Sequence, residues 1–103
     1  MGVTYDGFMK AIKGTKKQIE SIPNEEKDLT KRMDYLISFK QNFESNIENL
    51  EEENETKIEA VMDEGFQVVD KITEIEKSFK KYKEKKATFT EVCCVVKGVA
   101  YKP

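Results

Sequence analysis

The chain has 103 residues, of which 38% are hydrophobic and 37% are charged, and its formal net charge is −2. This length suits one small domain, and so much charge is typical of helical bundles and coiled coils rather than of an enzyme with a deep cleft. The small net charge excludes a global basic field for nucleic acid. No apolar stretch approaches the roughly 20 residues that span a bilayer, and the start of the chain lacks the pattern of a cleaved signal, so we expect a cytoplasmic protein.

Residues 4–22 are predicted to form a first helix, because apolar side chains recur there at helical spacing. They are Tyr5, Phe8, Ile12, Ile19 and Ile22. Pro23 is expected to end this helix, since a proline disfavours helical geometry at the preceding residue. The helix also carries a lysine face, made of Lys10, Lys13, Lys16 and Lys17. A nucleic-acid-associated regulator that uses this face is one alternative function.

Residues 25–50 are predicted to form a second helix, with Asn24 as its N-terminal cap. Its apolar seam has the three-and-four spacing of a coiled coil. The seam consists of Met33, Leu36, Phe43, Ile47 and Leu50, with Lys40 as the one charged residue in it, and Tyr35, Ile37 and Phe39 widen the apolar face. This face is broader than a contact between two helices needs.

Residues 56–86 are predicted to form a third helix, which begins with the capping-box pattern of Thr56 and Glu59. Its seam includes Ile58, Val61, Val68, Ile72, Ile75 and Phe79, and Met62, Phe66 and Val69 widen it. The last part of this helix is rich in lysine between residues 77 and 86. Because cations complement the negative end of a helix dipole, we interpret this run as a solvated helix end.

The seam breaks between Leu50 and Ile58, and two arrangements of an all-α protein fit the break. In the first, the chain reverses about residue 54 into an antiparallel helical hairpin or three-helix bundle with coiled-coil-like packing, which places Phe43 opposite Gly65. In the second, one rod of roughly 60 residues forms an antiparallel coiled-coil dimer. The sequence leaves both arrangements open.

Residues 88–103 are predicted to be a short β-prone tail, because β-branched residues and cysteine dominate their first part. In this prediction Lys97 and Gly98 turn the chain into a hairpin; the alternative is that the third helix continues and then frays. Cys93 and Cys94 are adjacent, so they lack the spacing of a zinc-binding pair. We interpret them as small apolar residues of a half-buried strand, with an intermolecular disulfide or acylation as alternatives.

The chain contains no histidine. This excludes Ser–His and Cys–His nucleophiles and the Glu-x-x-His pairs of di-iron bundles. Stacked carboxylates such as Glu51 and Glu55 are interpreted as a solvated acidic turn rather than a metal site. We therefore expect no catalytic residue, no cofactor, no metal and no enzymatic activity.

The broad apolar faces predict a non-enzymatic helical protein–protein interaction module: an adaptor, a small inhibitor or an assembly subunit. The predicted interface consists of Met33, Leu36, Ile37, Phe39, Phe43, Ile58, Val61, Met62, Phe66, Val69, Ile72 and Ile75. The expected partner is another protein or a second copy, which would give a homodimer. We expect neither nucleic acid nor a membrane as a partner, except for a membrane if Cys93 and Cys94 are acylated.

In size and helical-hairpin character, residues 25–86 resemble the small partner proteins of specialised bacterial secretion systems, the WXG100-like group. The segment from Phe66 to Asp70 has the Phe-x-x-x-Asp shape found in some accessory proteins of toxin export. The chain departs from the group, because it has no Trp-x-Gly at the turn and no Tyr-x-x-x-Asp/Glu after the last helix. The resemblance implies an alternative function as a helical partner or chaperone of secretion, and it transfers no site residue.

Overall fold

The structure is a computed structural model that describes residues 3–21 and 23–100, and most of these residues are helical. The elements are, in order, β1 (Val3–Thr4), α1 (Tyr5–Glu20), α2 (Glu26–Asn46), the short 3-10 helix η1 (Ile47–Asn49), β2 (Leu50–Glu51), α3 (Glu55–Lys83) and α4 (Phe89–Ala100). The prediction of a mainly all-α protein is confirmed. None of the described helices is long and apolar enough to cross a membrane.

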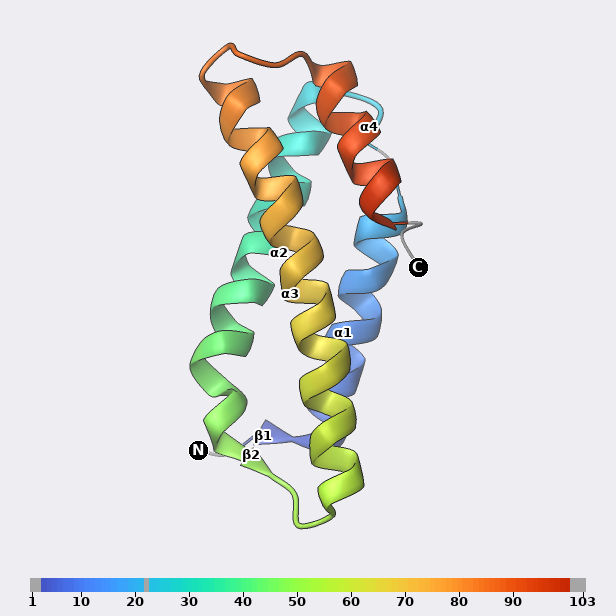
Figure 1. The fold of residues 1–103 in the computed structure, drawn as a ribbon, viewed down its shortest axis with the longest axis vertical. Helices are drawn as coiled ribbons and strands as arrows, with labels where there is room; N and C mark the ends of the chain where they lie inside the picture. Colours follow the sequence, from blue (N-terminus) through green and yellow to red (C-terminus); the bar gives the residue numbers. More distant parts are fainter. Residues whose placement is uncertain (1–2, 22, 101–103) are drawn as a thin grey trace.

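The helices lie side by side along the long axis of a molecule that measures 46 × 28 × 18 Å (Figure 1). The chain reverses between residues 47 and 54, so α3 runs back along α2. α1 packs against both of them, and α4 returns across α1 and α3 at the end opposite β1 and β2 (Figure 1). All four helices contribute to one buried apolar core.

The Phe43 ring lies at the centre of the part of the core that is nearest the acidic turn between α2 and α3. It contacts the rings of Phe8, Phe39 and Phe66, with centroid distances of 5.6, 5.8 and 5.1 Å. The predicted contact with Gly65 is present, and a Cβ atom on Gly65 would lie only 2.2 Å from Cζ of Phe43. The absence of a side chain on α3 at this point therefore lets the Phe43 ring fit between the helices.

The connection between α1 and α2 differs from the prediction at its cap. α1 ends at Glu20, and the Arg32 guanidinium donates to the carbonyl oxygen of Gln18 at 2.9 Å and to that of Ser21. α2 begins after Glu25, whose side chain makes no capping bond, so the predicted cap at Asn24 is wrong. Arg32 thus satisfies carbonyls at the end of α1 that have no partner within the helix. Ile22, predicted to belong to the seam, lies outside the described residues.

The connection between α2 and α3 contains a short parallel strand pair that the sequence did not predict. α2 ends at Asn46 rather than at residue 50, and Leu50 and Glu51 pair with Val3 and Thr4. Asn54 caps α3, because its side-chain oxygen accepts from the backbone N–H groups of Thr56 and Lys57 at 2.9 and 3.4 Å. The predicted cap at Thr56 is therefore wrong by two residues.

α3 ends three residues before the predicted boundary at Lys86. Lys85 has a positive φ of 62°, and its N–H donates to the Tyr82 carbonyl at 3.0 Å. The N–H of Lys86 reaches the Lys81 carbonyl at 2.7 Å. This pair of bonds is the Schellman motif, which stops a helix by placing one residue in the left-handed conformation.

The prediction of a β-prone tail at residues 88–103 is wrong for the described part, because residues 89–100 form helix α4. A reciprocal capping box starts this helix: the Thr88 hydroxyl accepts from the Glu91 N–H at 3.1 Å, and the Glu91 carboxylate accepts from the Thr88 N–H at 3.2 Å. Val92, Val96 and Val99 are then buried at helical spacing. Tertiary packing of this valine stripe on α1 and α3 outweighs the β propensity of the residues. Residues 101–103 lie outside the described residues.

Candidate interaction surface

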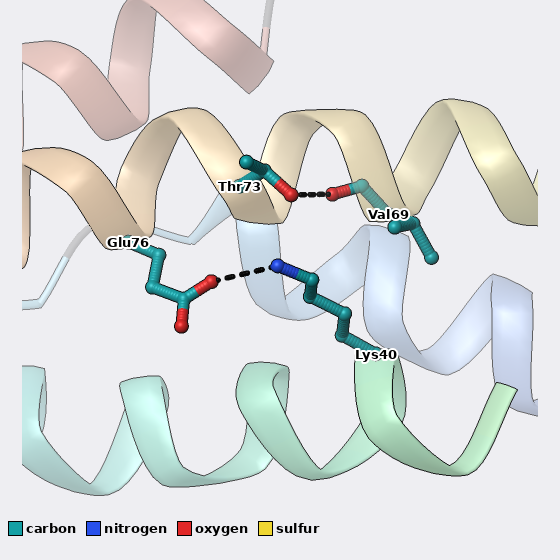
Figure 2. Close-up of polar contacts among 4 residues, drawn as sticks. All are labelled: Lys40, Val69, Thr73 and Glu76. Atoms are coloured by element: carbon teal, nitrogen blue, oxygen red, sulfur yellow. Dashed lines mark hydrogen bonds and ion pairs between the residues drawn. The ribbon is translucent and has the colours of Figure 1, made fainter. Parts of the chain in front are cut away.

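A groove of about 350 Å³ lies between α2 and α3. Its lining residues are Ile37, Thr73, Glu76, Lys77, Phe79, Lys80 and Lys83. Ile37 comes from α2, and the other six residues come from the last half of α3. In Figure 2, α1 passes behind this pair of helices. The apolar lining of the groove comes from Ile37 and Phe79. The groove therefore combines an apolar floor with a lysine bank.

An ion pair at the groove residue Glu76 joins α3 to α2. The Lys40 ammonium of α2 lies 3.0 Å from the Glu76 carboxylate of α3, and their side chains are 22% and 38% exposed (Figure 2). In the next turn of α3, the Thr73 hydroxyl donates to the Val69 carbonyl at 2.9 Å. Because each of these polar groups already has a partner within the chain, an apolar side chain that covers this wall of the groove leaves none of them without a hydrogen bond.

The lysine bank consists of Lys77, Lys80 and Lys83 and lies at the end of the groove nearest the C-terminus of α3. Lys77, Lys80 and Lys83 are exposed, and the Lys83 ammonium lies 5.4 Å from the centroid of the Phe79 ring. Such a contact holds a cation above an apolar surface. This bank is a feature that the sequence interpretation missed, because it treated the lysine run as a solvated helix end. The sequence did contain a signal for the bank: Lys77, Lys80 and Lys83 follow one another at three residues, on the same helical face as Thr73.

Tyr82 lies beside this bank and links it to α2. Its ring stacks on that of Phe79 with a centroid distance of 6.0 Å. Burial, and then a hydrogen bond and repulsion from the Glu26 carboxylate, raise the pKa of Tyr82 above its usual value. Each of these effects disfavours the phenolate, so the neutral phenol is the form that joins the two helices.

At the other end of the same side of α3, two large apolar side chains are exposed. Met62 is 41% exposed and Phe66 is 38% exposed, although the Phe66 ring also forms a T-shaped contact with that of Phe43. Counting along α3, Met62, Phe66, Thr73, Glu76, Lys80 and Lys83 follow one another at intervals of three, four and seven residues, which places them on one helical face. We call this face, together with Ile37 of α2, the groove face.

The structure divides the predicted interface into two groups. Eight of its members are buried in the core of this chain: Met33, Leu36, Phe39, Phe43, Val61, Val69, Ile72 and Ile75. The other four, Ile37, Ile58, Met62 and Phe66, are half-buried or exposed. Only the second group can contact a partner while the helices stay packed. Ile37, Met62 and Phe66 belong to the groove face.

The lysine face of α1 is partly engaged with α3. The Lys16 ammonium lies 3.4 Å from the Glu64 carboxylate, and both side chains are more than one third exposed. Lys10, Lys13 and Lys17 are exposed. No observation on this face indicates a base or phosphate contact.

The two cysteines are free thiols with different surroundings. Cys94 is exposed, whereas Cys93 is half-buried with its sulfur 3.9 Å from the Pro23 carbonyl oxygen. Burial, and then the charge of Cys94, raise the pKa of the Cys93 thiol. Among residues 3–21 and 23–100, no group of three or more histidine, cysteine or acidic side chains is placed to hold a metal ion.

Comparisons of the chain with protein families, with curated proteins and with solved structures find no match.

Proposed function

We propose that this chain is a non-enzymatic protein–protein interaction module, acting as an adaptor, a small inhibitor or an assembly subunit through the groove face. The observation that supports the proposal most directly is the exposure of Met62 and Phe66 beside the groove of Ile37 and Phe79. Large apolar side chains gathered on one surface favour association, because contact removes them from water. Packing within the chain leaves 41% of Met62 and 38% of Phe66 exposed, although the Phe66 ring also contacts that of Phe43.

Coiled-coil-like packing of α1, α2 and α3 as a three-helix bundle is part of the same proposal. The alternation of three and four residues in the seams supports it. A rod dimer that exchanges α3 between copies would use the same core contacts, so its formation would occupy the core residues of the predicted interface rather than the groove face.

Binding of a hydrophobic dye tests the groove face directly. Replacing Met62 and Phe66 together by serine is expected to abolish most of the dye fluorescence of the folded protein. The control is Tyr35→Ser, because Tyr35 is as exposed as Met62, at 45%, but is not among the residues that line the groove. Absence of dye binding to the original protein, or equal loss in the control, contradicts the proposal. Far-UV circular dichroism verifies that each variant keeps its helices.

A further inference from the structure

Charge is separated along the length of the molecule. Residues 44–63, around the turn from α2 to α3, hold eight acidic residues and one lysine. Residues 74–86, around the other end of α3, hold six lysines and three glutamates. The first part of α2, at the same end as those lysines, is close to balance, with four acids and three bases over residues 25–34. One end of the molecule is therefore strongly acidic, and the other is basic.

This charge separation coincides with the two parts of the groove face. Glu59 and Asp63 are exposed and precede Met62 and Phe66 by three residues, so they flank the exposed apolar pair. Lys77 and its neighbours flank the apolar groove. The apolar protrusion thus has an acidic rim, and the apolar groove has a basic rim. The protrusion and the groove therefore complement each other in shape, and their acidic and basic rims complement each other in charge.

We propose that the groove face binds a second copy of this chain in the antiparallel direction, so that Met62 and Phe66 of each copy enter the groove of the other. This proposal rests on the proposed function and names its partner. Asp63 and Lys77 are 14 residues apart, which is about 21 Å along α3. A two-fold axis near residue 70 relates them, and both contacts then form at once.

The antiparallel direction follows from the charges. A parallel arrangement brings the acidic turns of the two copies together, and it leaves each groove opposite another groove. The antiparallel arrangement places Glu59 and Asp63 opposite Lys77 and Lys80 twice. Close to the axis, Thr73 already donates its hydroxyl proton within its own helix, so it needs no polar partner from the other copy.

Two charge-reversed variants of the full chain test the proposal by sedimentation equilibrium. K77E/K80E reverses the basic rim, and E59K/D63K reverses the acidic rim. Each variant alone is expected to raise the dissociation constant of the dimer roughly 10- to 30-fold, because each reversal acts at both symmetric contacts. Salt at 0.5 M should reduce this effect. The matched control is K13E/K17E, which makes the same change of charge on the outer side of α1 and should leave the dissociation constant unchanged.

An equimolar mixture of the two variants is the decisive sample. In an antiparallel heterodimer, one contact joins the two reversed rims and the other joins the two original rims, so both are attractive. We expect the mixture to dimerise about as tightly as the original chain, whereas neither variant does so alone. Native mass spectrometry identifies the heterodimer, since the two chains differ in mass.

Four outcomes overturn the inference. Dimers that persist in both single variants indicate that the groove face is not the contact, as in a rod dimer that exchanges α3. A mixture that stays monomeric contradicts the antiparallel arrangement. If the original chain is monomeric at about 100 μM but binds dye through Met62 and Phe66, the second copy is not the partner and the proposed function still stands. If it is monomeric and binds no dye, both proposals are overturned.

Discussion

Substitution of Gly65 by alanine tests whether the Phe43 ring is held in one place. The new Cβ atom would lie 2.2 Å from Cζ and 2.4 Å from Cε2 of that ring, far inside van der Waals contact. Overpacking of this kind costs about 1–3 kcal/mol, whereas exchanging glycine for alanine within a helix returns about 0.5–1 kcal/mol. We therefore expect the free energy of unfolding to fall by about 1–2 kcal/mol.

The magnitude depends on whether the ring can move away from α3. Phe43 is 2% exposed, and the rings of Phe8 and Phe39 lie against it. Phe66, the third neighbouring ring, is at the surface and can be displaced. Movement toward Phe66 would bring the loss toward the lower end of the range. Protein interiors are close-packed, so movement toward Phe8 or Phe39 would transmit the strain instead.

Urea unfolding followed by far-UV circular dichroism measures this change by linear extrapolation. Gly98→Ala is the matched control, because a Cβ atom on Gly98 has no heavy atom within 4 Å and the residue lies in helix α4. The control is expected to raise the free energy of unfolding by up to about 1 kcal/mol. The same chemical change should therefore have opposite signs at the two glycines.

A double-mutant cycle identifies Phe43 as the cause. In a Phe43→Ala background the ring is absent, so Gly65→Ala is expected to stabilise the protein by about 0.5–1 kcal/mol. The coupling energy between the two positions should then be about 1.5–3 kcal/mol, in the upper part of the range that contacting residues show. If Gly65→Ala stabilises the original protein, or destabilises it equally in both backgrounds, the reasoning from the ring contact is refuted.

Four further predictions concern the caps and the titrating side chains. Asn54→Ala should lower the free energy of unfolding by about 1 kcal/mol in urea melts, with Asn54→Asp as the control that keeps the cap. Lys85→Gly should raise it by about 0.5–1 kcal/mol, because glycine adopts the positive φ at no steric cost; a loss would contradict this account. The raised pKa of Tyr82 predicts a contribution to stability that is complete below pH 10 and is lost as pH rises through its folded pKa; Tyr82→Phe should remove this loss of urea-melt stability above pH 10. Iodoacetamide should alkylate Cys94 faster than Cys93 in the folded protein, and equal rates by mass spectrometry would contradict their assigned surroundings.

The apolar seams of α2 and α3 could be predicted from the sequence because their buried residues recur at the helical period. Phe43 opposite Gly65 was readable for a further reason, since a large ring needs a small residue across from it. The strand pair was not readable: two-residue strands such as Val3–Thr4 and Leu50–Glu51 have no periodicity of their own. Their pairing arises only when the reversal of the chain brings the turn beside β1.

The α4 helix shows a local signal that was present but outweighed by composition. Thr88 and Glu91 match a capping box in the sequence, and their reciprocal bonds form in the structure. Val92, Val96 and Val99 also have helical spacing. The β-branched residues around them fit a strand equally well. The segment becomes a helix because α1 and α3 supply the surface that buries its valines.

Within the groove face, the sequence identified Ile37, Met62 and Phe66 among twelve candidate contacts but did not separate them from the core. Met33 and Met62 carry the same side chain in the same kind of pattern, yet Met33 is fully buried and Met62 is 41% exposed. The difference depends on where neighbouring helices lie around each helix axis. Similarly, the lysines at residues 77–83 became part of a groove only through Ile37 on another helix.

The amino-acid sequence alone was enough to predict that this protein is mainly helical, that it lacks histidine chemistry, and which face of α2 and of α3 is apolar. Those properties follow from residue types and from their spacing along one chain. Only the tertiary structure decided that α3 returns along α2, that the tail is a helix, and which apolar side chains are left at the surface. Each of these outcomes depends on contacts between segments distant in the chain, and periodicity specifies the face that a helix buries but not the neighbour that buries it.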